Sequence, residues 1–181
     1  MKPGKFAFLT LLITIVLSIN NRVDGQSAGR EVLNFNFGWK FYKGDISNGQ
    51  DPNLDDRNWR ALNLPHDWSI EGTFSKDYAS STAYLPAGIG WYRKSFKLPA
   101  TEKNRKVFIN FDGIYNNSEV WINGTWLGKR PNGYISFQYD LTPYLNPGKE
   151  NLIAVKVDHT KYGDSRWYTG SGIYRDVKLI F

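Results

Sequence analysis

A short segment around residue 165 carries three side chains that could bind a sugar. Asp164 offers oxygen acceptors, Arg166 offers N–H donors in a fixed fork, and Trp167 offers a flat apolar face. The segment follows a strand pattern and precedes a Gly-Ser-Gly stretch, so we expect a loop at one end of the fold. A structural alternative remains, in which Trp167 and Tyr168 plug that end. In that arrangement Asp164 and Arg166 pair with each other.

A second group consists of Arg130, Asn132 and Tyr134, which also combine donors with an aromatic ring. The stretch Pro131-Asn132-Gly133 is a turn signal in its own right, so a structural role is the stronger interpretation for this group. Trp121 precedes a hairpin signal. We expect it to pack in the core or across strands rather than to carry a sugar.

The residue types needed for a nucleophile or a metal site are scarce. The sequence has no cysteine and two histidines, His66 and His159. A zinc site needs three or four ligands, and neither histidine lies near a Gly-x-Ser-x-Gly turn. We expect His66, between Pro65 and Asp67, to pack in a loop. No catalytic residue, metal ligand or cofactor is expected from this chain.

Strands must position the candidate side chains, because alternation of apolar and polar residues dominates the sequence. Alternating runs cover 33–41, 107–111, 135–141, 153–157 and 173–181, with a mixed run at 91–98. Asn123-Gly124 between apolar runs predicts a β-hairpin, and residues 141–145 are compatible with one helical turn. Many short strands separated by Gly and Pro turns predict an all-β fold, a sandwich or jelly roll.

The charge distribution and the aromatic content indicate which class of partner the protein binds. The formal net charge is +6, yet no block of five or six like charges occurs, so no nucleic-acid partner is expected. The 7 Trp, 11 Tyr and 11 Phe are typical of β-sandwiches and of domains that face carbohydrate. Without cysteine the core must hold by packing alone.

Residues 1–25 have the layout of a secretory signal peptide. Basic residues precede an apolar run at 6–19, and small residues lie just before Gln26. That run is shorter than the about 20 residues a comfortable membrane span needs. We expect cleavage near Gln26, one domain over 26–181, and a secreted or periplasmic protein with no membrane contact after cleavage. An uncleaved membrane anchor is the alternative.

Five stretches occur in an order that resembles a known family. They are residues 64–68 (Leu-Pro-His-Asp-Trp), 88–94 (Gly-Ile-Gly-Trp-Tyr-Arg-Lys), 111–124 (Phe-Asp-Gly, then Val-Trp-Ile-Asn-Gly), 128–141 and 166–175 (Arg-Trp-Tyr-Thr-Gly-Ser-Gly-Ile-Tyr-Arg). Each stretch is a weak signal alone, but five in order over about 37–181 are specific. Together they resemble the N-terminal sugar-binding domain of glycoside hydrolase family 2, in particular its bacterial β-galactosidase branch.

The resemblance implies a jelly-roll sandwich of the galactose-binding-domain type. In the family this domain precedes an immunoglobulin-like domain and a barrel with the two catalytic glutamates of a retaining mechanism, which needs carboxylates about 5–5.5 Å apart. None of the chain's own glutamates lies in a stretch like those motifs: Glu31, Glu71, Glu102, Glu119 and Glu150. Since the sequence ends at Phe181, where the first domain would end, we expect this chain alone to be inactive.

The resemblance also implies partners and site residues. Asp164 and Arg166 carry over to a loop that helps to shape the galactose pocket, with Trp167 as a candidate wall. The implied partners are a β-galactoside and the catalytic barrel of the enzyme, although β-mannosidases and β-glucuronidases share this first domain. A free-standing secreted carbohydrate-binding module is the alternative function, and a fragment with no retained role is a third.

Overall fold

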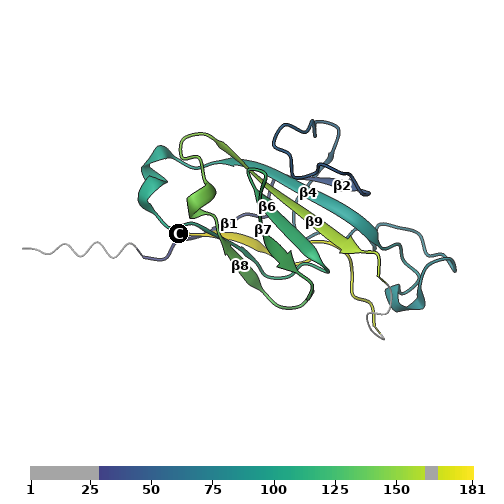
Figure 1. Ribbon diagram of the computed structural model, residues 1–181. Coiled ribbons are helices and arrows are strands. Elements are labelled where there is room, and N and C mark those ends of the chain that lie inside the picture. Colours follow the sequence, from purple (N-terminus) through teal and green to yellow (C-terminus); the bar gives the residue numbers. More distant parts are fainter. Residues whose placement is uncertain (1–28, 162–166) are drawn as a thin grey trace, which may run out of the picture.

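Two antiparallel sheets pack face to face in the computed structural model, which describes residues 29–161 and 167–181 (Figure 1). The smaller sheet has the strand order β1 (Val32–Asn34), β10 (Val177–Ile180), β5 (Phe108–Phe111), β8 (Phe137–Asp140). The larger has the order β3 (Arg60–Leu62), β2 (Trp39–Lys43), β4 (Gly88–Lys97), β9 (Glu150–His159), β6 (Ser118–Ile122), β7 (Thr125–Arg130). The expected all-β jelly-roll sandwich is confirmed.

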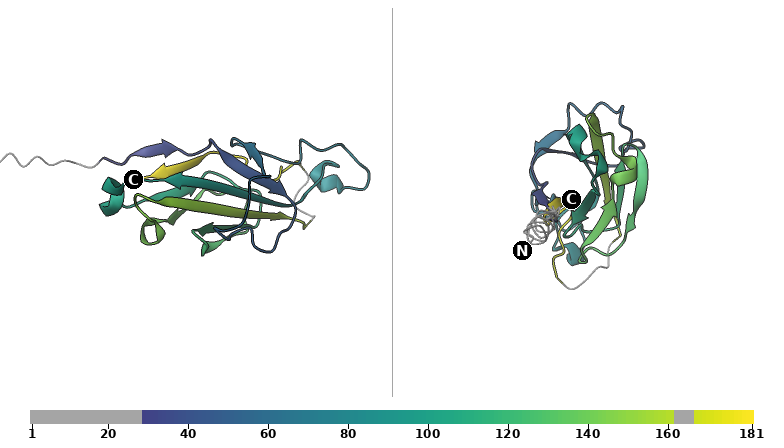
Figure 2. Two further views of the ribbon diagram at one scale, coloured as in Figure 1. Left: turned by 90° about the horizontal axis from the view of Figure 1, so that it is seen from above. Right: turned by 90° about the vertical axis from the view of Figure 1, so that its left-hand side faces the viewer.

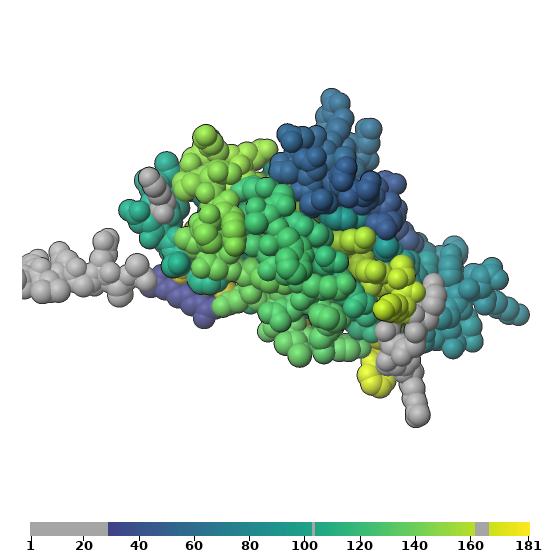
Figure 3. All heavy atoms as spheres, in the orientation of Figure 1, coloured from purple at the N-terminus to yellow at the C-terminus, as the bar shows by residue number. Residues whose placement is uncertain are grey.

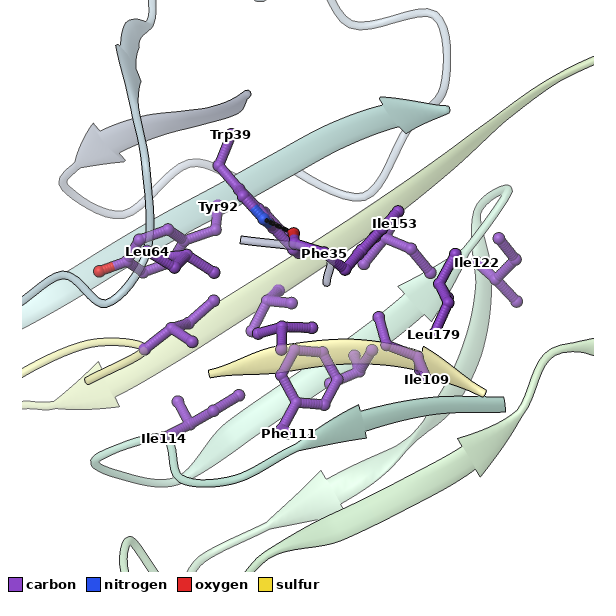
Figure 4. Close-up of a cluster of buried hydrophobic side chains, with 14 of the residues drawn as sticks. Phe35, Trp39, Leu64, Tyr92, Ile109, Phe111, Ile114, Ile122, Ile153 and Leu179 are labelled. Carbon is purple, nitrogen blue, oxygen red and sulfur yellow. Dashed lines mark hydrogen bonds between the residues drawn. The ribbon is translucent and has the colours of Figure 1, made fainter. Parts of the chain in front are cut away.

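The core lies between the sheets and is built by the period-two alternation of each strand. Tyr92 on β4, Val155 on β9 and Val120 on β6 are in register and fully buried. Ile109 and Phe111 of β5 approach them from the smaller sheet (Figure 4). Burial of one such side chain contributes about 1.5–3 kcal/mol, so packing alone can hold a fold that has no cysteine.

The expected single strand over 33–41 is wrong, because β1 and β2 belong to different sheets. Between them the Asn36 side chain accepts the Val177 N–H at 2.7 Å and donates to Asp176 at 2.8 Å. Gly38 then adopts a φ of +71° and turns the chain toward the larger sheet. Phe37, expected on the apolar face, is consequently exposed.

Local turn signals are confirmed elsewhere. Asn123-Gly124 connects β6 and β7 as a hairpin, and a single turn of 3₁₀ helix covers Thr142–Tyr144. Two further short 3₁₀ segments, Ser80–Thr82 and Ala100–Asn104, lie in connections between strands. None of the helices in the described ranges has the length and apolar character to cross a membrane.

Four connections meet at one end of the sandwich, which we call the loop end. They are residues 63–87 between β3 and β4, 112–117 between β5 and β6, 131–136 between β7 and β8, and the described part of 160–176 between β9 and β10. The long β3–β4 connection projects beyond the sheets there, on the opposite end from Phe181 (Figure 2). Any ligand site built from these loops must lie at this end.

Candidate functional site: the loop end

A half-buried carboxylate, that of Asp67, joins two of the four connections. Asp67 Oδ1 accepts the backbone N–H of Ser69 at 2.9 Å and that of Ser171 at 2.8 Å. Its other oxygen, Oδ2, accepts the hydroxyl of Tyr168. Burial and this carboxylate hold the pKa of Tyr168 well above its usual range, so the ring stays a neutral donor. Asp67 therefore fixes the chain at Tyr168 and Ser171, in the last part of the β9–β10 connection.

A chain of hydroxyls continues inward from this point. Ser69 Oγ donates to the Pro86 carbonyl at 2.7 Å and lies 2.5 Å from Ser171 Oγ, which in turn lies 2.7 Å from His159 Nδ1. Ser69, Ser171 and His159 are all buried. Buried polar groups are unfavourable unless they are paired. This hydrogen-bonded series therefore rigidifies the loop end and does not expose a nucleophile.

His66 occupies a second network beside the first. Its Nδ1 lies 2.7 Å from the Tyr92 hydroxyl and its Nε2 lies 3.2 Å from Glu71, which Arg60 binds through two hydrogen bonds of 2.6 and 2.7 Å. Burial lowers the pKa of His66, against the opposing effect of Glu71. The hydrogen bonds from Arg60 lower the pKa of Glu71. The structure thus places His66 in loop packing, as the sequence indicated.

Aromatic rings form the outer rim. Trp167 is 64% exposed, and its indole N–H donates to the Tyr134 hydroxyl at 3.3 Å. Tyr134 packs edge-on against Tyr115 with ring centres 5.5 Å apart, and Tyr115 packs edge-on against His159 at 5.1 Å. The buried network therefore supports the rim through His159 and Tyr115. The rim presents aromatic ring faces, together with hydroxyl groups, at the surface.

Exposed apolar side chains gather at the same end. Among the described residues, eight of the fourteen exposed large hydrophobic side chains belong to its connections: Ile70, Phe74, Tyr78, Tyr84, Tyr134, Ile135, Trp167 and Tyr168. In Figure 3 the teal β3–β4 connection and the yellow atoms after residue 166 make up this side of the molecule. An apolar hollow of about 630 Å³ lies between Phe74 and Tyr84.

A more polar hollow of about 500 Å³ is lined by residues from all four connections. Its lining residues are Pro65, Asp112, Ser136, Tyr174, Arg175 and Asp176. Lys178 binds Asp112 at 2.6 Å, whereas Arg175 stacks over the Tyr174 ring at 5.2 Å and forms no ion pair with the described residues. The loop end thus offers sugar-type contacts: aromatic faces, hydroxyls, carboxylates and a guanidinium group.

The candidate residues of the sequence have mixed outcomes. Asp164 and Arg166 lie outside the described residues, so their roles stay predictions. Trp167 lies at the loop end and contacts Tyr134, which brings two separate candidate groups together. Asn132 Oδ1 accepts the N–H groups of Tyr134 and Ile135 and so closes its own turn.

The remaining candidates lie elsewhere or act structurally. Arg130 covers the rings of Phe137 and Tyr139. Trp121 packs across strands on the outer face of the larger sheet, stacked on Trp91 with ring centres 5.4 Å apart. No group of three or more potential metal ligands occurs in the part of the chain that the structure describes.

Sequence reasoning missed Asp67 and Ser171 as the residues that organise this end. The two residues are 104 positions apart in the sequence, and no local pattern predicts a contact over such a separation. Their only signal was their place inside two of the five recognised stretches, where Asp67 follows His66 and Ser171 separates two glycines.

The antiparallel sandwich with aromatic and polar end loops defines a carbohydrate-binding type of β-domain. Comparison with known proteins makes this specific, because residues 55–181 match the family described as glycosyl hydrolases family 2, sugar binding domain. The chain belongs to this family. It is 51% identical over 152 residues to the β-galactosidase BoGH2A of Bacteroides ovatus, covering 83% of this chain and 18% of that enzyme.

Other relatives agree on the family and differ in their named substrates. A putative β-glucuronidase of Formosa agariphila is 47% identical over 174 residues, covering 95% of this chain and 16% of that protein. A crystal structure of a β-glycosidase from Bacteroides vulgatus superposes with a TM-score of 0.79 at 59% identity, covering 83% of this chain and 20% of that one. The chain thus spans about a fifth or less of the length of these relatives.

Proposed function

We propose that this chain is the sugar-binding domain of a secreted family 2 β-galactosidase. In this proposal its loop end packs on a catalytic barrel and supplies part of the rim of the substrate pocket. The carrying observation is the concentration of exposed apolar side chains over a rigid polar network at that one end. Apolar patches of this kind mark interaction surfaces.

Asp164, Arg166 and Trp167 are the proposed sugar-facing residues. Support comes from Trp167, whose exposed ring stands on the rim beside Tyr134, and from Tyr168, which Asp67 anchors directly after it. A galactoside offers hydroxyls for Asp164 and Arg166 and a C–H face for the indole ring. The name of the Bacteroides ovatus relative favours a galactoside over the glucuronide named for the Formosa relatives.

Reconstitution tests this proposal. The Bacteroides ovatus β-galactosidase is produced without the region that this chain matches, and the 181-residue chain is added to it. We expect the two to co-elute on gel filtration and to hydrolyse 4-nitrophenyl β-galactoside faster than 4-nitrophenyl β-glucuronide, with no hydrolysis by the chain alone. Hydrolysis by the chain alone, or separate elution, contradicts the proposal.

A matched pair of variants locates the contact. Trp167→Ala should raise the KM of the reconstituted enzyme, whereas Trp126→Ala should leave it unchanged. Both residues are exposed tryptophans, 64% and 56%, but Trp126 lies on β7 away from the rim. Equal effects of the two substitutions would argue against a rim role for Trp167.

Secretion is proposed from the basic and apolar layout of residues 1–25. The full chain is expressed in a Gram-negative host, and the periplasmic fraction is analysed by N-terminal sequencing. A mature protein beginning near Gln26 is the expected result. A protein that keeps its first 25 residues in the membrane fraction would support the anchor alternative instead.

A further inference from the structure

The outer face of the larger sheet is partly covered by the connection between β2 and β3, residues 44–59. Arg93 of β4 holds this cover in place, because its guanidinium donates to Asp56 at 2.8 Å and to the carbonyls of Gly49 and Asp51 at 2.7 and 2.9 Å. Gly49 lies so close to the Trp91 ring that a Cβ there would stand 2.4 Å from it. Figure 3 shows the cover in blue above the green strands.

A groove of about 450 Å³ remains between this cover and strand β6. The cover contributes Asp45, Ile46, Ser47 and Gln50 to the lining of the groove, and strands β4, β6 and β9 contribute the rest. This volume lies within the about 300–1,000 Å³ that is usual for small-molecule sites. The groove lies on a sheet face, whereas the rim described above is built from end loops.

Two tryptophans form the floor of the groove. Trp91 on β4 and Trp121 on β6 stack with ring centres 5.4 Å apart and planes 26° from parallel, although β9 runs between their strands. Ala154 of β9 is the partner of Trp121 in the ladder, and its small side chain leaves room for this contact across a strand. Trp91 is buried beneath the cover, and Trp121 is half-buried beside it.

Polar groups surround this aromatic floor. Lys156 pairs with Trp91 and with Glu119 in the two ladders, so the three residues form one row across the sheet. The Lys156 ammonium lies 5.7 Å from the Trp91 ring centre and 2.9 Å from the Asp45 carboxylate. Gln50 and Ser47 add further donors and acceptors from the cover.

We propose that this groove is a second carbohydrate site and that it binds neutral pyranose units of an oligosaccharide. The half-buried Trp121 ring, supported by the buried Trp91 ring, suits the apolar C–H face of a pyranose, and the carboxylates, ammonium and amide suit its hydroxyls. Lys156 already binds Asp45 at 2.9 Å, and Lys129 beside the groove lies 3.6 Å from Glu119, so the lining has no unpaired cation for the carboxylate of a uronate. The groove therefore selects neutral sugars.

An unsatisfied donor adjoins the groove. The Trp91 indole N–H is buried and has no acceptor among the residues that the structure describes. Leaving a buried donor unpaired is unfavourable, so a ligand oxygen that reaches this N–H by a shift of the cover would add a hydrogen bond without displacing another. The same N–H gives a separate NMR signal that reports occupancy of the groove.

The test is calorimetry and indole ¹H–¹⁵N NMR on the full chain with galactotetraose, cellotetraose and the C6-oxidised cellouronate tetramer. We expect a neutral tetramer to bind at about 1 mM or tighter and to shift the Trp91 and Trp121 signals. We expect the cellouronate to bind at least tenfold more weakly. Absence of binding by both neutral tetramers, or equal binding of cellouronate, would overturn the proposal.

Three variants separate the groove from the loop end. Trp121→Ala should weaken neutral-tetramer binding at least tenfold and abolish the shift of the Trp91 signal, whereas Trp167→Ala should leave that shift in place. Asp45→Ala, at an exposed loop position, should also weaken binding and keeps the test decisive if Trp121→Ala does not fold. Loss of binding in Trp167→Ala with binding retained in the groove variants refutes the groove site, while leaving the proposed function intact.

Discussion

The carboxylate of Asp67 accepts the backbone N–H of Ser171 at 2.8 Å, across 104 residues of sequence. Through this bond the β3–β4 connection holds the start of the segment that leads into β10. Gly170, immediately before Ser171, lies so close that a Cβ there would stand 2.7 Å from Asp67 Oδ2. The loop end is consequently a fixed surface rather than a set of independent loops.

Asp67→Ala should destabilise the chain by about 3 kcal/mol. The substitution leaves the N–H groups of Ser69 and Ser171 without their acceptor inside the protein, and each unpaired buried group is unfavourable by about 1–3 kcal/mol. Urea unfolding followed by tryptophan fluorescence measures the loss. Asp55→Ala is the control, because its partner Arg57 is exposed and such pairs contribute about 0–1 kcal/mol. Equal losses for both variants would show that Asp67 is not the organising residue.

Stability should fall as the pH is lowered through the range set by His66. Its folded-state pKa lies below the usual value near 6.5, so the unfolded chain takes up a proton that the folded chain excludes. The stabilisation is complete above about pH 6.5 and is lost progressively below it. The charged neighbours Glu71, Arg60 and Asp67 face the ring, and the lowered pKa of Glu71 acts in the same direction below about pH 4.5.

The measurement for His66 is the thermal midpoint between about pH 7.5 and 5.5. The wild-type midpoint should decrease over this interval, and that of His66→Gln should change less, because the amide does not titrate. A wild-type midpoint that rises toward pH 5.5 would show that the sign is wrong.

Gly172→Ala should unfold the chain or reduce its stability by more than about 3 kcal/mol. Gly172 has a φ of +123°, and a Cβ there would stand 2.3 Å from the Tyr92 hydroxyl and 2.7 Å from the His66 carbonyl. Gly38→Ala is the matched control, since φ is +71° and no atom lies within 4 Å of the added Cβ. The free energy of unfolding of Gly38→Ala should decrease by only about 1 kcal/mol, from backbone strain. Comparable losses in the two variants would exclude crowding as the cause.

The purified chain should self-associate through its loop end, and Phe74→Ser should reduce this. Phe74 is 74% exposed beside the apolar hollow that Tyr84 completes. Phe37→Ser is the control, because Phe37 is 63% exposed but its carbonyl contacts Lys94, in the half of β4 remote from the loop end. Sedimentation velocity over a range of concentrations distinguishes the two. A monomer at all concentrations, or an equal effect of both substitutions, would contradict this use of the surface.

The sequence predicts a strand well where the alternation of apolar and polar residues lies within that one strand. β5, β6 and β9 carry their inward residues at the expected positions, and Asn123-Gly124 forms the expected hairpin. In the run at 135–141, Phe137 and Leu141 are buried as expected, but Ile135 is exposed. The prediction for 33–41 is wrong because the apolar residues continue to alternate where the chain passes from the smaller sheet to the larger one. What divides that run is the Asn36 side chain bonding to Asp176 and Val177, a contact over 140 residues that alternation does not encode.

The loop position of Trp167 was predictable from the sequence, but the contacts that support this loop were not. The Trp167 segment lies at the expected end, whereas the support beneath it depends on Asp67 and on the Ser69–Ser171–His159 chain. Single polar residues inside loops carry no periodic signal, because their partners are chosen by the tertiary fold. The groove over Trp91 escaped notice for the same reason, since its cover is a loop bound through Arg93.

Strand β10 lies in the interior of the smaller sheet, between β1 and β5. A ribosome that has made β1, β5 and β8 has therefore produced strands that have no completed sheet to join. Only when residues 177–180 emerge can both neighbours pair, and the earlier strands must stay free of wrong partners until then. The smaller sheet should accordingly be completed only when β10 enters between β1 and β5, whereas the larger sheet, which lacks β10, does not wait for this step.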